Sequence, residues 1–240
     1  MKDGKYIIGM IKPSTEGRGQ SAGSQKKMLP ENVSLTSVAL GIKDLVPSQL
    51  TAALSGIEQA AGELAARDVD VISMGGTPPV VFGGYGFDKE IIARINKVTP
   101  IPATTSQTSS VEAIRLLGAK KIVIVTPFSD YVNQMVIKFM EASGFIVRSL
   151  QTANAPFEEF PKMPLSLSYE LALKAVKTAP DAECIYIPCA AWLTSDNIEP
   201  LEKETGIPVV TSTQSGVWGV LRLAGVKTHI HGYGCLLHDF

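Results

Sequence analysis

Two stretches of the sequence decide the fold: "DVDVISMGGTPP" at residues 68–79 and "DAECIYIPCAAW" at residues 181–192. They align without a gap. Each starts with an aspartate, continues into an apolar run typical of a buried strand, and ends in small residues. Just beyond the apolar run, Gly76 of the first stretch corresponds to Cys189 of the second. One strand end therefore carries a thiol where its counterpart carries no side chain.

Two more pairs of segments repeat in the same order along the chain. "IIGMIKPST" at residues 7–15 resembles "IVIVTPFSD" at 122–130, and "TPIPATTSQTSSVEAIRLLGAK" at 99–120 resembles "TGIPVVTSTQSGVWGVLRLAGV" at 205–226. Three matches in one order favour an internal duplication over the general likeness of any two α/β halves.

Short β-rich runs alternate with longer segments of helical periodicity, which is typical of parallel α/β architecture. One long helix is expected over residues 47–67, with Ser48 as its cap. The fold class predicted is α/β with two similar parallel-sheet lobes related by a pseudo-twofold axis. The lobes are expected at residues 1–118 and 119–240. The C-terminal helix of the first lobe could cross over to the second.

Composition narrows the classes of function. The chain has 240 residues, a net charge of −1 and scattered basic residues. The sequence therefore shows no cluster of positive charge of the kind that binds nucleic acid or a membrane surface. The charged opening residues do not resemble a secretory signal, and no apolar run is long enough to span a membrane. Three cysteines do not make a disulfide framework. We therefore expect a cytoplasmic protein, and its oligomeric state stays open.

The candidate site follows from where ligands bind in parallel sheets, beyond the carboxyl ends of the strands. The turns at these ends are rich in hydroxyl groups and glycine: "KPST", "GGTPP", "TTSQTSS", "TPFSD", "PCAAW" and "TSTQS". Such turns bring hydroxyl and backbone N–H groups to an anion. If the lobes face each other, Gly76 and Cys189 flank one cleft, which then holds a single acid/base group.

At these residues the sequence resembles the Asp/Glu racemase superfamily, and most closely its arylmalonate decarboxylase and maleate isomerase branch. The resemblance covers essentially the whole chain and rests on "GMIKPS", "SMGGT", "VTPFSDYVN", "PCAAWLTSDNI", "GVLRLAG" and "HGYG". Racemases and maleate isomerases of this group carry two cysteines, whereas arylmalonate decarboxylases keep the second and have glycine at the first. Gly76 with Cys189 matches the decarboxylase pattern. Glu16, where maleate isomerases have asparagine, counts against isomerisation.

The resemblance implies decarboxylation of a substituted malonate, with no metal or other cofactor. One carboxylate would be held by hydroxyl and N–H groups, while the other would leave as CO₂ from a surface lined by Leu40, Leu45 and Leu50. Cys189 would then protonate one face of the enediolate as a general acid. The partner is a small carboxylate, and the substrate-binding positions carried over are Pro13, Ser14, Gly76, Thr77, Phe128, Ser129 and Ala190.

Two positions depart from the family. Phe128 stands where the family usually has tyrosine, and Pro78 where the decarboxylase has serine, so two hydroxyl donors are lost. Ser14, Thr126 and Ser129 are the residues that could compensate.

Alternative interpretations stay open. An isomerase or racemase would need a replacement base, either Glu16 or a hydroxyl near Ser14, and a non-catalytic carboxylate-binding protein needs none. Cys189 could also be a small buried hydrophobe. Residues 14–27 are expected to form a mobile loop over the site. The pair His229 and His231 lacks the cysteine or carboxylate ligands that would complete a metal site.

Overall fold

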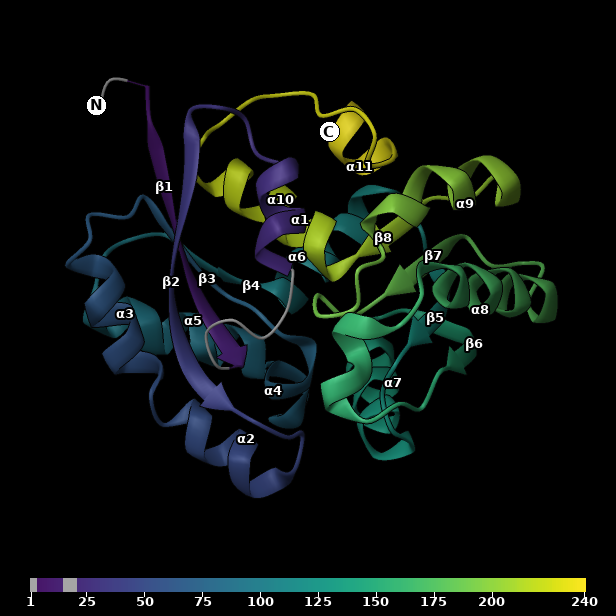
Figure 1. Cartoon of the computed structure of the whole chain (residues 1–240), viewed down its shortest axis with the longest axis horizontal. Helices are drawn as coiled ribbons and strands as arrows, with labels where there is room; N and C mark the ends of the chain where they lie inside the picture. Colours follow the sequence, from purple (N-terminus) through teal and green to yellow (C-terminus); the bar gives the residue numbers. More distant parts are fainter. Residues whose placement is uncertain (1–3, 15–20) are drawn as a thin grey trace.

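The computed structural model describes residues 4–14 and 21–240. It contains two four-stranded parallel sheets, ordered β2-β1-β3-β4 and β6-β5-β7-β8 (Figure 1). The order is the same in both, so the predicted α/β class with two similar parallel sheets is confirmed. The strands are β1 (Tyr6–Ser14), β2 (Val33–Ile42), β3 (Val71–Met74), β4 (Ala103–Thr105), β5 (Lys121–Thr126), β6 (Ile146–Thr152), β7 (Cys184–Ile187) and β8 (Val209–Thr211).

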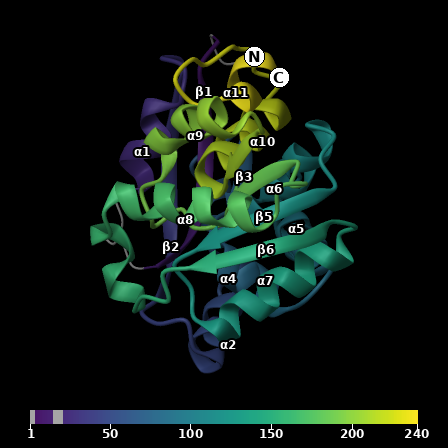
Figure 2. The same cartoon turned by 90° about the vertical axis from the view of Figure 1, so that its right-hand side faces the viewer.

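Helices cover both faces of each sheet. Figure 1 shows α3 on one side of the first sheet and α10 on the other, and Figure 2 shows α8 and α7 on opposite sides of β6. The helices are α1 (Ser21–Lys27), α2 (Pro47–Leu54), α3 (Ile57–Ala65), α4 (Thr77–Phe82), α5 (Phe87–Val98), α6 (Ser106–Leu116), α7 (Asp130–Ala142), η1 (Phe157–Lys162), α8 (Leu165–Thr178), η2 (Ser195–Asn197), α9 (Ile198–Thr205), α10 (Ser212–Leu223) and α11 (Cys235–Asp239). Among the described residues, no helix is both long and apolar enough to cross a membrane.

Four local features differ from what the sequence predicted. The helix expected over 47–67 is two helices, α2 and α3, which separate at Ser55 and Gly56. Pro47 opens α2, where its missing N–H is harmless, so Ser48 is not the cap. Residues 21–27 form α1 instead of part of a loop, while Glu16 lies outside the described residues. The edge strand β2, rich in serine and threonine, was not predicted.

The two halves pack through helices that reach across to the opposite sheet. Helices α6 and α10 pack on each other, and α6 also contacts β8 while α10 contacts β3 and β4. Small residues permit the close approach: Ser110 and Ser215 share a hydrogen bond of 2.8 Å, and a Cβ at Gly219 would lie 2.2 Å from Ser109 Oγ. The helices begin alike, because Thr105 and Thr211 each accept a hydrogen bond from the backbone N–H three residues on.

A buried phenol from β7 also joins the halves. Tyr186 is fully buried, and its hydroxyl donates to Gln107 Oε1 at 3.0 Å. Gln107 in turn donates from Nε2 to Met140 Sδ at 3.1 Å. Burial raises the pKa of Tyr186 to about 12, and the neighbouring side chains of Ser110, Thr77 and Gln107 oppose that rise. Three residues before Cys189, the second half is therefore anchored to polar groups of the first.

Removing this hydroxyl is expected to destabilise the protein. In Tyr186→Phe the buried Gln107 carbonyl loses its donor, which costs about 1–3 kcal/mol of unfolding free energy. Tyr131, on α7 and 52% exposed, provides the control Tyr131→Phe, which should change stability very little. Urea unfolding of both variants tests this. Equal stability of the two would mean that the Tyr186–Gln107 bond contributes nothing net.

Candidate active site

The first half of the site is built around Pro13 and Gly76. Pro13 has no N–H to give to the ladder, and the register of β1 shifts between Lys12 and Ser14. Gly76 follows β3 with φ of +86°, a conformation that glycine adopts without strain. A Cβ at Gly76 would lie 2.2 Å from Pro13 Cγ. The space that a side chain at position 76 would need is therefore filled by the proline ring.

The residues that follow Gly76 start α4. Thr77 is 1% exposed, and its Oγ1 lies near the Tyr186 hydroxyl but makes no hydrogen bond of normal geometry in the part of the chain that the structure describes. A buried hydroxyl without a partner is unusual, and a bound ligand is one way to satisfy it. Pro78 is buried in the first turn, where a helix tolerates proline.

Cys189 lies two residues beyond the end of β7 and is 6% exposed. Burial raises the pKa of its thiol to about 12, against the opposing influence of the Trp192 and Ala191 backbone N–H groups. The thiol is therefore protonated at neutral pH, while the same N–H groups can stabilise a thiolate formed transiently. Ala190, the next residue, is half-buried. Cys184, on the preceding strand, is part of the core as expected.

Phe128 and Ser129 occupy different environments although they are neighbours. Phe128 is 1% exposed, and its ring lies 5.8 Å from that of Phe160, centroid to centroid. Ser129 is exposed at the start of α7. Thr126 is not free to replace the lost hydroxyl donors, because its buried Oγ1 donates to Asn133 Oδ1 at 2.6 Å. Because its hydroxyl proton is already engaged, Thr126 is a weaker candidate for this compensation than Ser14 or Ser129.

A pocket of about 160 Å³ brings these segments together, lined by Ser14, Phe157, Glu158, Pro161 and Ala191. Ser14 is next to Pro13, and the Ala191 N–H faces the Cys189 thiol. Phe157 meets Phe160 edge to face at 5.4 Å, and Phe160 meets Phe128. Of the predicted site residues, Ser14 lines this pocket, while Cys189 lies two residues before its lining residue Ala191 and Phe128 is linked to it through Phe160.

The sequence-based prediction missed the residues of η1. Phe157 packs on the hydrophobic cluster of Ile42, Leu50 and Ala53, which Leu40 and Leu45 also contact. The three leucines predicted to form the apolar side of the site are thus joined by an aromatic ring from the other half. The segment "FEEFPK" has two adjacent glutamates between two phenylalanines and no helical or strand period, so nothing local distinguishes it from an exposed loop.

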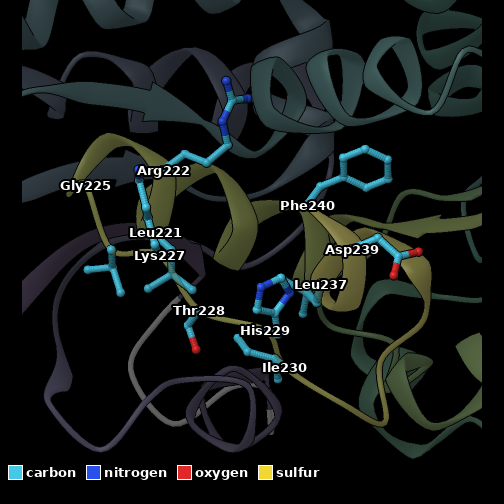
Figure 3. A pocket seen from close by; sticks show the side chains of 11 residues that line it. Leu221, Arg222, Gly225, Lys227, Thr228, His229, Ile230, Leu237, Asp239 and Phe240 are labelled. Carbon is cyan, nitrogen blue, oxygen red and sulfur yellow. The ribbon is translucent and has the colours of Figure 1, made fainter.

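A larger pocket of about 440 Å³ lies at the C-terminal segment and contains none of the predicted site residues. Figure 3 shows Arg222 extending away from His229 and Ile230; its guanidinium lies 4.4 Å from the centroid of the Trp218 ring. His229 Nδ1 lies 2.6 Å from the His238 carbonyl oxygen. Across residues 4–14 and 21–240, no three His, Cys, Asp or Glu side chains are grouped to hold a metal. The polar groups of this pocket do not converge, so we place the candidate site at Gly76 and Cys189.

Comparisons with known proteins agree with this architecture. The family model described as arylmalonate decarboxylase matches residues 8–237. Arylmalonate decarboxylase of Bordetella bronchiseptica is 28% identical over 236 residues, covering 97% of this chain and 96% of the relative. A maleate isomerase of Geobacillus stearothermophilus is 24% identical and covers 97% of each chain.

Among solved structures, the liganded form of an arylmalonate decarboxylase with one glycine-to-cysteine and one cysteine-to-serine substitution superposes with a TM-score of 0.92. It is 25% identical, and the match covers 98% of this chain and all of that one. The match of the family model over nearly the whole length shows the family, and both kinds of relative are enzymes. The chain belongs to the arylmalonate decarboxylase family.

Proposed function

We propose that the protein is a cofactor-independent decarboxylase of a substituted malonate, with Cys189 as its single proton donor. The observation that carries the proposal is the contrast between the two strand ends. Cys189 is a buried, protonated thiol, whereas the position matching it, Gly76, has its side-chain space filled by Pro13. Two-sided proton transfer needs a group on each side of the substrate carbon, and the two strand ends, as the structure describes them, offer one.

The reaction requires little beyond positioning and electrostatics. The Thr77 hydroxyl and neighbouring backbone N–H groups hold one carboxylate, as in an oxyanion hole. The other carboxylate, set against the Phe157 and leucine surface, is poorly solvated and leaves as CO₂. The electrons of the broken C–C bond form an enediolate, and the Cys189 S–H protonates its α-carbon. The thiolate then regains a proton from water.

The test is CO₂ release in D₂O from a panel of α-aryl-α-methylmalonates, whose products have a stereogenic α-carbon, with the product's enantiomeric composition and deuterium content. We expect one enantiomer carrying one α-deuterium, and no exchange of the α C–H when the unlabelled product is incubated with the protein in D₂O. Isomerisation of maleate without CO₂ release would support the isomerase reaction of the maleate isomerase relatives instead. Exchange of the product C–H would indicate a second base and racemisation.

The pH dependence gives an independent test. Because burial raises the pKa of Cys189 to about 12, the protonated, active form persists far above the ordinary thiol pKa of about 8.5. We therefore expect kcat/KM to stay level from pH 7 to about 10 and to fall only as pH approaches the raised pKa. Circular dichroism at each pH controls for alkaline unfolding. A fall centred near pH 8.5 would show that the donor has an ordinary thiol pKa.

A further inference from the structure

Among the described residues, the pocket beside the candidate site is lined by one charged side chain. Of its lining residues, Phe157, Pro161 and Ala191 are apolar, Ser14 contributes a hydroxyl, and Glu158 contributes a carboxylate. Small-molecule sites are mostly apolar, with few polar groups that set orientation and specificity. A carboxylate in such a place influences which ligands can enter.

This pocket adjoins both candidate strand ends. Ser14 continues β1 from Pro13, whose ring covers Gly76, and Ala191 follows Cys189 closely enough that its N–H faces the thiol. A malonate held between these strand ends therefore has the pocket as its neighbour. Its volume of about 160 Å³ suits a substituent of the substrate and does not suit a whole large ligand.

Glu158 and the next residue, Glu159, differ in whether their carboxylates form an ion pair. Glu159, on the same turn of η1, forms an ion pair with Lys162 at 2.9 Å and does not line the pocket. Glu158 makes no ion pair with any residue that the structure describes. It is exposed, so water and salt screen its charge, and no cation within residues 4–14 and 21–240 forms an ion pair with it. Its negative charge is therefore presented to whatever occupies the pocket.

We propose that Glu158 makes this pocket select substrates by charge. It favours malonates with a neutral or cationic substituent and disfavours those that bring a further carboxylate. This inference rests on the proposed decarboxylase function and names its substrate class. Since exposed ion pairs contribute modestly, the preference between cationic and neutral substituents should be about two- to five-fold, and a third carboxylate should be disfavoured by a similar factor.

The experiment uses three probes that cannot lose CO₂: phenylacetate, 4-(aminomethyl)phenylacetate and 4-carboxyphenylacetate. Their dissociation constants are measured by calorimetry with the wild type, Glu158→Gln and the matched control Glu159→Gln. We expect the wild type to prefer the aminomethyl compound and disfavour the dicarboxylate, and Glu159→Gln to keep that order. Glu158→Gln should bring the three constants together, and Glu158→Lys should invert the order. A wild-type order that Glu158→Gln leaves unchanged would overturn the proposal.

The corresponding arylmalonates, assayed for CO₂ release with the same proteins, separate this inference from the proposed function. Turnover of all three malonates with no change of preference in Glu158→Gln would refute the role of Glu158 and leave decarboxylation standing. A charge order that depends on Glu158 in the binding data, without CO₂ from any malonate, would support the selectivity and refute decarboxylation.

Discussion

Replacing Cys189 by alanine is expected to lower kcat for arylmalonate decarboxylation by roughly 10²–10⁴-fold, the usual contribution of a positioned general acid. KM should change little, because the proposed contacts to the retained carboxylate come from Thr77 and backbone N–H groups. Water then has to protonate the enediolate from either side, so the residual product should approach a racemate. Chiral chromatography of the product and steady-state kinetics measure both effects.

The matched control is Cys235→Ala. Cys235 is a second thiol with a raised pKa, but it lies on α11, where its Sγ donates to Glu202. We expect this variant to keep the wild-type kcat and enantiomeric composition. A Cys189→Ala protein that folds and still turns over at the wild-type rate with one enantiomer would exclude the thiol as proton donor.

Replacing Gly76 by alanine is expected to destabilise the protein by about 2–6 kcal/mol. A non-glycine residue at φ of +86° carries about 1–3 kcal/mol of backbone strain. The added Cβ would also lie 2.2 Å from Pro13 Cγ, and overpacking of this kind typically costs about 1–3 kcal/mol. For a chain of this size, each kcal/mol lowers Tm by about 2–4 °C.

The adjacent glycine provides a matched control. A Cβ at Gly75 would meet its nearest atom, the Ile11 carbonyl oxygen, at 3.7 Å, an ordinary contact, and Gly75 has no positive φ. Gly75→Ala should therefore shift Tm much less. Adding Pro13→Ala to Gly76→Ala should relieve the overlap and restore part of the loss, while the backbone strain persists. Equal Tm values for the two glycine variants would show that Pro13 moves aside without a measurable penalty.

Much of the architecture was predictable because its signals are local. Strands such as the apolar run before Cys189 differ in period and composition from the helices between them, and the duplicated segments indicate two similar sheets. The predictions failed where local signals are weak. The helix expected over 47–67 contains a break at Ser55 and Gly56 that its continuous apolar periodicity conceals, and β2 has the mixed polarity of an edge strand.

The sequence by itself determined that the chain forms two like parallel sheets, and that Gly76 and Cys189 stand just beyond corresponding strands. Only the tertiary structure decided what surrounds them. The Pro13 ring fills the space at Gly76, η1 brings Phe157 and Glu158 to the pocket, and the Tyr186–Gln107 hydrogen bond joins residues 79 positions apart. The physical reason is that strand and helix preferences act over a few residues. Close packing depends on how distant segments meet, and no local pattern specifies which side chains will share a cavity.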